Sequence, residues 1–443
     1  MIGPTPAESA RNDLGDRLAS RHSLRVEPEA RDNPLTFRTI RDLHELEALR
    51  SIWNSWPGTR DSDIDFFSSM VRSRGSRCRP HVIVLTRETR PHSILIGLCE
   101  RKKMPFKLSY FTIYEPEVNV LEFVDGGLRG NASDENCATL VQEVMKSLDE
   151  GDADLALWER LSVKSPLYNC ALRLPRFALR DHSLCLDGRW LMNFRKDLDS
   201  VFMNLGRSQR SKLRRKYRNV LNHFVGKVRI RCFRSPTDLE PAISDMEAIA
   251  SKTDKRRLFE TGFIDTPQIR EQMVVAASKG WLRIYILHLE EKPAAYWMGT
   301  IYDQCLQADY VGYDPVWSKF SPGIFLFLNI LEDLRDEDIK TVDFGWRDIQ
   351  IKQCFGALRR VEARVCIYAP TLRGIKLNLL TTAIHCATRG AILLLRRTHC
   401  LAWARRVLRD QLARQCRKHP AGFSKGLQRA QGLTGTTNAL PPS

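Results

Sequence analysis

Short apolar runs that alternate with amphipathic stretches predict an α/β fold over most of the chain. Residues 35–195 form a predicted first lobe with strands at His81–Thr86, Ser93–Cys99, Val118–Phe123 and Ala153–Trp158 and helices at Leu43–Trp56 and Cys137–Leu148. Strands separated by helices are typical of α/β architecture.

The same alternation returns in a predicted second lobe, residues 196–370. Its segments are strands at Val228–Phe233, Leu282–Leu289 and Ala294–Ile301 and helices at Pro241–Ser251 and Pro267–Lys279. The sequence Glu-Glu-Lys-Pro at 290–293 predicts a hairpin turn between the last two strands. The chain therefore divides into two lobes of similar size.

A strand, a tight turn and an apolar helix follow one another in the second lobe. The strand is Cys305–Gly312, and Ser321, Pro322 and Gly323 precede the apolar run that starts at Ile324. Serine suits a helix N-cap, proline suits the first turn, and glycine lets a ligand approach the backbone. Unpaired amides at a helix start bind anions such as a cofactor pyrophosphate. An ordinary helix start is the alternative interpretation.

A second strand, Thr341–Trp346, follows the apolar helix and completes a strand, helix, strand unit. The two strands of such a unit lie parallel, and ligands bind beyond their carboxyl ends. This arrangement predicts that Tyr313, Asp343 and Lys352 lie near one crevice.

Three short motifs in this region resemble those of a known family. They are Gly-Tyr-Asp-Pro at 312–315, Phe-Ser-Pro-Gly at 320–323, and Asp-Phe-Gly at 343–345 with a lysine nine residues after the aspartate. From about Ser208 to Gly356 the chain resembles bacterial GNAT-type acyltransferases associated with cellulose and exopolysaccharide synthesis, which look related to Fem peptidoglycan aminoacyl ligases. Where that family has Tyr-Lys, this chain has Ile351-Lys352, and Trp346-Arg347-Asp348 replaces a glycine-containing turn.

The resemblance implies tandem GNAT-like lobes with mixed sheets, and acetyl-CoA or another acyl-CoA as donor. It also implies an amine or hydroxyl acceptor on a polysaccharide, sugar or lipid precursor. The donor pyrophosphate is assigned to Ser321, Pro322, Gly323 and Ile324. The first lobe has no equivalent turn, so we expect it to shape the acceptor cleft without binding a donor phosphate.

GNAT-like chemistry needs positioning and proton transfer from the protein. Asp343 is the candidate base or acceptor anchor, Lys352 could steady the oxyanion or a substrate phosphate, and Tyr313 could protonate the leaving thiolate. Each residue has a structural alternative: Asp343 as a cap of the next turn, Lys352 as a surface charge, and Tyr313 as a packing residue.

A basic segment connects the two lobes. Residues 197–225 predict one long helix that contains seven cations and no acid between Arg207 and Arg218. Arg214, Arg215 and Arg218 are therefore candidates for binding a negatively charged substrate or the donor phosphates. The alternative is a solvated face that packs through Leu213, Tyr217 and Leu221.

Most of the net charge of +17 lies near the end of the chain, where Thr371–Ala430 holds thirteen Lys or Arg and one acid, Asp410. Residues 371–443 predict a basic helical tail with a disordered end. Such a tail would attract anionic membrane, nucleic acid or acidic polymer, or it is a solvated appendage. Peripheral membrane contact is thus compatible with the sequence.

Other features narrow the class of protein. The twelve cysteines and ten histidines lack the spacing of a metal site, which fits a reducing cytoplasm and no metal. Residues 1–34 look disordered and unlike a secretory signal, and no run of about eighteen apolar residues predicts a spanning helix.

Two alternative functions stay open at this stage. An aminoacyl-tRNA-dependent, Fem-like transferase would use the basic helix for phosphate contacts. No long heptad insert lies between Ser235 and Leu282 to serve as a Fem-type arm. A non-catalytic scaffold of an exopolysaccharide machine is the second alternative, which the altered turn at Trp346 favours and the intact Ser-Pro-Gly turn disfavours.

Overall fold

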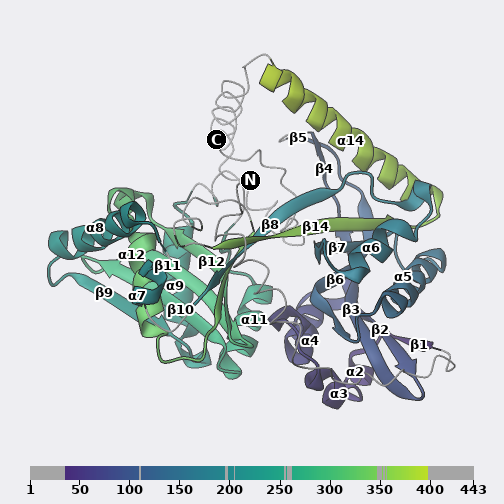
Figure 1. The fold of residues 1–443 in the computed structure, drawn as a ribbon, viewed down its shortest axis with the longest axis horizontal. Coiled ribbons are helices and arrows are strands. Elements are labelled where there is room, and N and C mark those ends of the chain that lie inside the picture. Colours follow the sequence, from purple (N-terminus) through teal and green to yellow (C-terminus); the bar gives the residue numbers. More distant parts are fainter. Residues whose placement is uncertain are drawn as a thin grey trace, which may run out of the picture.

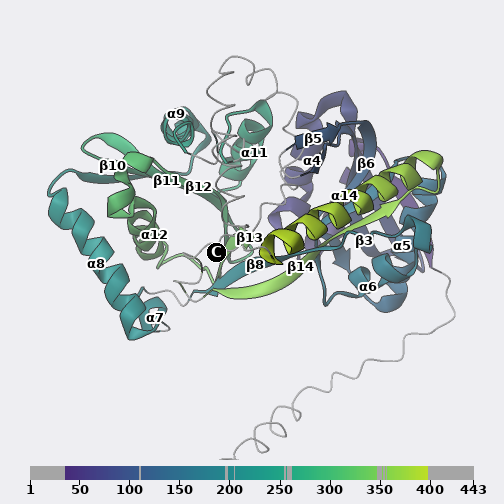
Figure 2. The same cartoon turned by 90° about the horizontal axis from the view of Figure 1, so that it is seen from above.

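The computed structural model describes residues 35–397 except 109–110, 195–197, 204, 254–255, 257–261, 347–351, 353–354 and 356. One mixed sheet of twelve strands runs through both lobes, in the order β1-β2-β3-β6-β7-β14-β8-β13-β12-β11-β10-β9, and helices cover it (Figures 1 and 2). The fold is α/β, as the sequence predicts.

The first lobe contains five of these strands and most of the smaller helices. Its strands are β1 (Thr36–Ile40), β2 (Cys78–Arg87), β3 (Arg90–Lys103), β6 (Glu117–Gly130) and β7 (Leu155–Ser162). Its helices are α2 (Leu43–Glu47), α3 (Arg50–Ser55), α4 (Ile64–Ser73), α5 (Asp134–Asp149) and α6 (Pro166–Arg173), with short turns η1 (Arg60–Ser62) and η3 (Phe177–Leu179). A separate hairpin is formed by β4 (Phe106–Leu108) and β5 (Phe111–Tyr114).

The second lobe follows the same order of elements. Its strands are β9 (Val228–Phe233), β10 (Leu282–Leu289), β11 (Lys292–Tyr302), β12 (Cys305–Tyr313) and β13 (Thr341–Trp346). Its helices are α7 (Leu198–Met203), α8 (Arg207–His223), α9 (Leu239–Ala250), α11 (Pro267–Ser278) and α12 (Pro322–Asp333), with the turn η5 (Pro315–Phe320) before α12. The predicted strands are confirmed to within a few residues, and Glu290 and Glu291 form the hairpin turn with positive φ.

Two strands cross between the lobes and join them. β8 (Cys185–Asn193) pairs with β13 of the second lobe, and β14 (Leu358–Tyr368), late in the chain, pairs with β7 of the first. β8 and β14 also pair with each other. The predicted lobe boundary after residue 195 therefore falls between segments that share one continuous sheet.

Each lobe has one parallel strand pair that separates partway along. In the first lobe β6 pairs with β7 only from Val120 to Phe123, and in the second β12 pairs with β13 only from Cys305 to Gln307. Both strands of each pair continue beyond that point. The parallel pairing of β12 and β13 confirms the predicted strand, helix, strand unit.

Two predicted helices are in fact interrupted. The basic segment forms α7 and α8, separated around Gly206, which has an extended backbone conformation and N-caps α8. The segment Leu43–Trp56 forms α2 and α3, because the chain turns at Ala48 and Leu49. Leu213 and Tyr217 of the predicted packing stripe do face the core, whereas Leu221 is exposed and Val220 is buried in its place.

A long helix, α14 (Leu372–Arg397), ends the described chain and confirms the helical start of the predicted tail. Residues 398–443 and 1–34, including the predicted disordered ends, lie outside the described residues. Within the described ranges, no helix has both the length and the apolarity needed to cross a membrane.

A buried histidine makes the stability of the first lobe depend on pH. His81 on β2 is fully buried, its Nε2 lies 3.3 Å from Ser147 Oγ, and burial lowers its pKa from 6.5 to about 4. Between these values the unfolded chain binds a proton that the folded chain does not, so stability falls as pH falls from 6.5 toward 4. We expect a loss of about 2 kcal/mol between pH 7 and pH 5 from this residue, measured by urea unfolding.

His81→Leu separates this contribution from the other titrating groups. The variant should lose less stability than the wild type over the same pH range, because it carries no group that protonates on unfolding. Equal losses in both proteins would show that His81 is not responsible.

Candidate functional site

The start of α12 is a partly buried helix N-terminus without a charged residue in its first turn. Pro322 has no N–H group, and the Ile324 and Phe325 amides donate to the Ser321 carbonyl, at 3.0 and 3.2 Å. Gly323 N–H has no acceptor in the described part of the chain, and a Cβ on Gly323 would meet nothing within 4 Å. The Gly323 amide is thus left without a described acceptor beside open space, and both features suit an anion site at a helix N-terminus.

Ser321 does not cap this helix as the sequence predicts. It occupies the N-cap position, but its backbone is left-handed (φ 54°, ψ 54°) and its side chain makes no capping hydrogen bond. The left-handed residue turns the chain sharply out of η5, which exposes the amide of Gly323. Ser321 therefore acts through its backbone in this structure.

The equivalent helix of the first lobe is chemically different. α5 follows β6 as α12 follows β12, but Ser133 caps it and Asp134 and Glu135 occupy its first turn. The first turn of α12 has no acid. Carboxylates at the start of α5 would repel a phosphate, so of these two equivalent helices α12 has the N-terminus suited to one.

A buried cluster of charges lies where β12 and β13 separate, and we call it the junction cluster. Its members are Arg60, Asp61, Asp125, Arg189, Asp309, Asp343 and Glu362. They come from η1, β6, β8, β12, β13 and β14, so both lobes and both crossing strands contribute. The cluster holds five carboxylates and two guanidinium groups, and the Arg160 guanidinium lies nearby, 3.2 Å from the centre of the Trp346 ring.

Arg189 is at the centre of this cluster. Its Nε and Nη2 donate to Asp343 at 2.7 and 2.6 Å, and its Nη1 lies 3.0 Å from Asp125 and 3.5 Å from Glu362. Asp343 has no exposed surface, and its other oxygen accepts from the Gly345 amide at 2.8 Å. Asp343 thus caps the following turn and anchors Arg189; its role as a base stays a prediction.

Two carboxylates of the junction cluster have raised pKa values. Burial raises the pKa of Asp125, although Arg189 opposes the shift, and burial likewise raises the pKa of Asp309 against the charge of Arg60. Both oxygens of Asp309 lie 2.6 Å from Arg60 Nη1. Only one oxygen of Asp125 accepts a hydrogen bond from a described side chain. Asp125 is therefore the carboxylate best placed to take up a proton.

Asp309 occupies a β-bulge. Met298 pairs with Tyr310 and Gly299 with Ala308, so Asp309 is the extra residue of β12. A bulge re-aims a side chain and interrupts pairing. Here it directs Asp309 toward Arg60 of the first lobe, two residues beyond the last β12 residue that pairs with β13.

Lys352 lies beside Asp343, as the sequence predicts, but it is buried. Its Nζ donates to the carbonyl oxygens of Gly345 and Trp346, at 3.1 and 2.7 Å. The alternative of a surface charge is wrong, and Lys352 fixes the backbone that leaves β13. Arg347, Asp348 and Ile351 lie outside the described residues.

Tyr313 is separated from the other two candidates. It is half-exposed at the end of β12, six residues beyond Gln307, which pairs with Asp343. Six strand residues span about 20 Å. Asp343 and Lys352 therefore lie buried at the end of β13, whereas Tyr313 lies at the far end of β12, and a crevice that joins all three stays a prediction.

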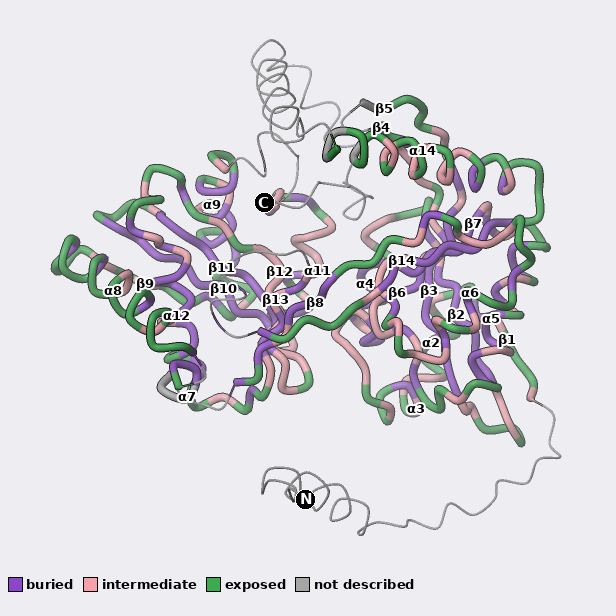
Figure 3. The backbone as a smooth tube through the Cα atoms, turned by 45° about the horizontal axis from the view of Figure 1, so that its top comes forward, coloured by how far each residue is buried: buried purple, intermediate pink, exposed green. Residues whose placement is uncertain are grey.

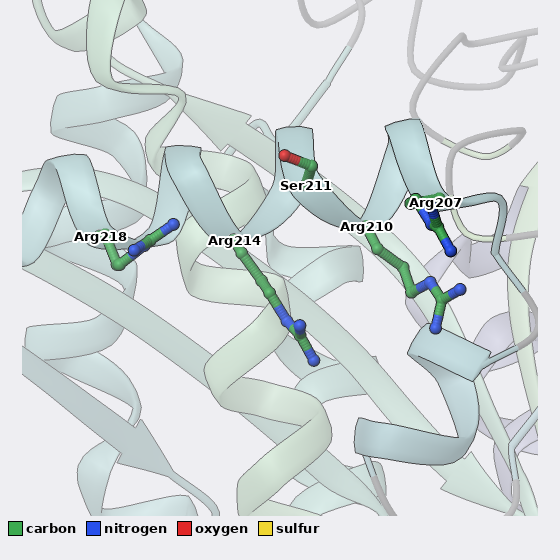
Figure 4. A pocket seen from close by; sticks show the side chains of 5 residues that line it. All are labelled: Arg207, Arg210, Ser211, Arg214 and Arg218. Atoms are coloured by element: carbon green, nitrogen blue, oxygen red, sulfur yellow. The ribbon is translucent and has the colours of Figure 1, made fainter.

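The arginines of α8 lie along one side of the helix (Figure 4). Arg207, Arg210, Arg214 and Arg218 line a shallow hollow of about 460 Å³, and no described carboxylate pairs with them. The other end of α8 contacts the turn, because Phe224 packs on Phe320. Arg214 is ten residues from Phe224, about 15 Å along the helix. Arg215 is exposed on the same helix.

Sequence reasoning missed Arg60, Asp125, Arg189 and Asp309. They are separated in sequence by up to 249 residues, and no local motif links them. A charged residue inside an apolar strand was the available signal, as at Asp309 between Ala308 and Tyr310. Within the described residues no group of His, Cys, Asp and Glu is arranged to hold a metal ion.

Comparisons with known proteins agree with this geometry. Residues 207–353 match the model of the acetyltransferase (GNAT) domain, whereas a search of curated proteins gave no match. FemX matches 75% of this chain and 97% of its own, at 10% identity and a TM-score of 0.50. L-PGS from Bacillus licheniformis matches 78% of this chain and 99% of its own, at 11% identity and a TM-score of 0.46. A tandem GNAT protein from the clavulanic acid biosynthesis pathway matches 76% of this chain and 99% of its own, at 8% identity and the same TM-score. The second lobe contains a GNAT-type acetyltransferase domain, and the two lobes of the α/β fold follow the same order of elements.

Proposed function

We propose that this protein transfers an acetyl or other acyl group from acyl-CoA to an amine or hydroxyl of a sugar, polysaccharide or lipid precursor. One observation carries the proposal: β12 and β13 separate beyond Gln307 and Asp343, and the acid-free start of α12 follows the far end of β12. An elongated thioester donor fits between separating strands while its pyrophosphate contacts the helix start. The GNAT domain match covers this region.

The donor side uses backbone groups. The Gly323 amide and the dipole of α12 hold the pyrophosphate, and Ser321, Pro322 and Ile324 set the course of the turn. Lys319, exposed two residues before Ser321, supplies a cation at the same turn. The unpaired edge of β12 beyond Gln307 offers amides and carbonyls to the arm of the donor.

The acceptor side is the junction cluster, whose excess of carboxylates favours an amine over an anionic acceptor. The amine nitrogen attacks the thioester carbonyl, the C–S bond breaks, and the thiolate leaves. Asp125 takes the proton lost from nitrogen, because its pKa is raised and one of its oxygens is open. Asp343 and Lys352 hold Arg189 and the β13 backbone in position. The thiolate takes its proton from solvent, because Tyr313 lies about 20 Å along β12 from the residue that pairs with Asp343.

Gly323→Trp tests the donor site. The new side chain would meet no protein atom near its Cβ, so the variant should fold while filling the space proposed for pyrophosphate. We expect at least a tenfold loss of acetyl-CoA affinity in calorimetric titration. The matched control is Gly206→Trp, at another helix start with open space around its Cβ, which should bind as the wild type does.

A second candidate function, aminoacyl transfer from charged tRNA, is favoured by the row of α8 arginines with which no described carboxylate pairs. If this second function is correct, acetyl-CoA will not bind and tRNA will. The double variant Arg210→Gln/Arg214→Gln will then bind tRNA more weakly than the wild type does. Arg214, Arg215 and Arg218 would then contact RNA phosphates. Failure of both ligands to bind would leave the scaffold function.

A further inference from the structure

One face of α14 is fixed against the first lobe. Leu377 is buried in a cluster with Phe106 and Tyr368, and Asn378 Nδ2 donates to the carbonyls of Ala178 and Arg180, at 2.9 and 2.8 Å. Gly374 lies against the Ala369 backbone so closely that a Cβ there would clash. These contacts determine which face of α14 points outward (Figure 3).

The outward face carries an apolar row. Leu372, Leu379 and Leu393 recur at multiples of seven residues and are 91%, 66% and 64% exposed. The exposed Cys386 completes the same spacing, and the small residues Ala383 and Ala387 lie beside it. Such repeated exposure of leucine on one helix face indicates an interaction surface.

The β4–β5 hairpin extends this surface at the start of α14. Ile113 and Tyr114 are 59% and 43% exposed, and Lys376 Nζ lies 5.6 Å from the centre of the Tyr114 ring. Tyr114 and Leu372 also line one hollow of about 500 Å³. We call the outward faces of α14 and of this hairpin the α14 face.

The charges around this row are positive. Arg373, Lys376, Arg389 and Arg397 flank it, and the sequence from 371 to 397 has no acidic residue. Two carboxylates at the start of α14 are already paired: Glu117 with Arg101 at 2.8 Å, and Asp154 with Arg373 at 3.3 Å. Leucine with flanking Lys and Arg on an exposed face is the composition of a helix that lies in a lipid headgroup layer.

We propose that the α14 face docks the protein on an anionic lipid surface, with the leucines in the acyl boundary and the cations among the headgroups. A two-stranded coiled coil between copies needs a second apolar row four residues on. Those positions are Lys376, Ala383, Gly390 and Arg397, which favours lipid as the occupant.

The test uses the full chain and vesicle cosedimentation. Vesicles of phosphatidylcholine alone are compared with vesicles in which about one third of the lipid is phosphatidylglycerol. We expect binding to the anionic vesicles and at least a tenfold loss in Leu379→Ser/Leu393→Ser, because each buried leucine contributes about 1.5–3 kcal/mol. Val225→Ser, at an equally exposed apolar residue outside the α14 face, should bind as the wild type does.

Hydrogen exchange then locates the contact. On anionic vesicles, peptides from 106–114 and 372–397 should gain protection, whereas peptides from α8 should not. The proposal fails if the protein does not bind anionic vesicles, or if the double variant binds as well as the wild type. It also fails if the wild type is a dimer and the double variant is a monomer, since the α14 face would then join two copies of the chain.

Discussion

Asp125→Asn is expected to lower kcat about 100-fold or more, with little change in KM for the donor. The asparagine keeps the shape of the side chain and can still accept from Arg189, but it cannot take up the proton released by the attacking amine. The rate is measured as release of CoA thiol from acetyl-CoA with amino-sugar acceptors.

The pH profile distinguishes loss of a base from loss of structure. Burial raises the pKa of Asp125, and the carboxylate must be ionised to act. In the wild type kcat/KM should therefore fall as pH drops through that raised pKa, and the residual rate of Asp125→Asn should lack this limb. Asp187→Asn, at an exposed carboxylate on β8, is the control and should keep the wild-type rate and profile. A wild-type rate in Asp125→Asn would remove Asp125 from the mechanism.

Arg189→Met is expected to destabilise the protein by about 3–5 kcal/mol, because it leaves the fully buried Asp343 without its cation. Asp125 and Glu362 would lose the same partner. Urea unfolding measures the effect, and adding Asp343→Asn to Arg189→Met should recover part of the loss, since the amide has no buried charge.

Arg38→Met provides the comparison for that loss. Arg38 pairs with Glu45 in solvent, where an ion pair contributes about 0–1 kcal/mol. If Arg189→Met cost no more than Arg38→Met, the junction cluster would not hold the two lobes together as its geometry indicates.

The parts of the fold that were predicted correctly depend on local sequence. The apolar run after Gly323 predicts α12, and the alternation at Thr341–Trp346 predicts β13, because periodicity and turn residues act over a few positions. The positive φ of Ser321 was not predictable, since a residue other than glycine rarely adopts it.

The parts that were missed depend on pairing between distant segments. Nothing in the sequence of β8 or β14 indicates that β8 pairs with a strand of the second lobe and β14 with a strand of the first. Because that exchange brings Arg189 to Asp343, and the bulges bring in Asp125 and Asp309, the acceptor side of the site could not be assembled from motifs. The donor side could be assembled from motifs, because the single turn before α12 supplies all the residues assigned to it.

A crystal structure of the protein grown with acetyl-CoA tests the central claim most directly. We expect one molecule per chain, with its pyrophosphate on the Gly323 amide, its arm between β12 and β13, and its thioester next to the junction cluster. Acetyl-CoA bound at α5 of the first lobe, or bound away from the gap between β12 and β13, would contradict the proposed function.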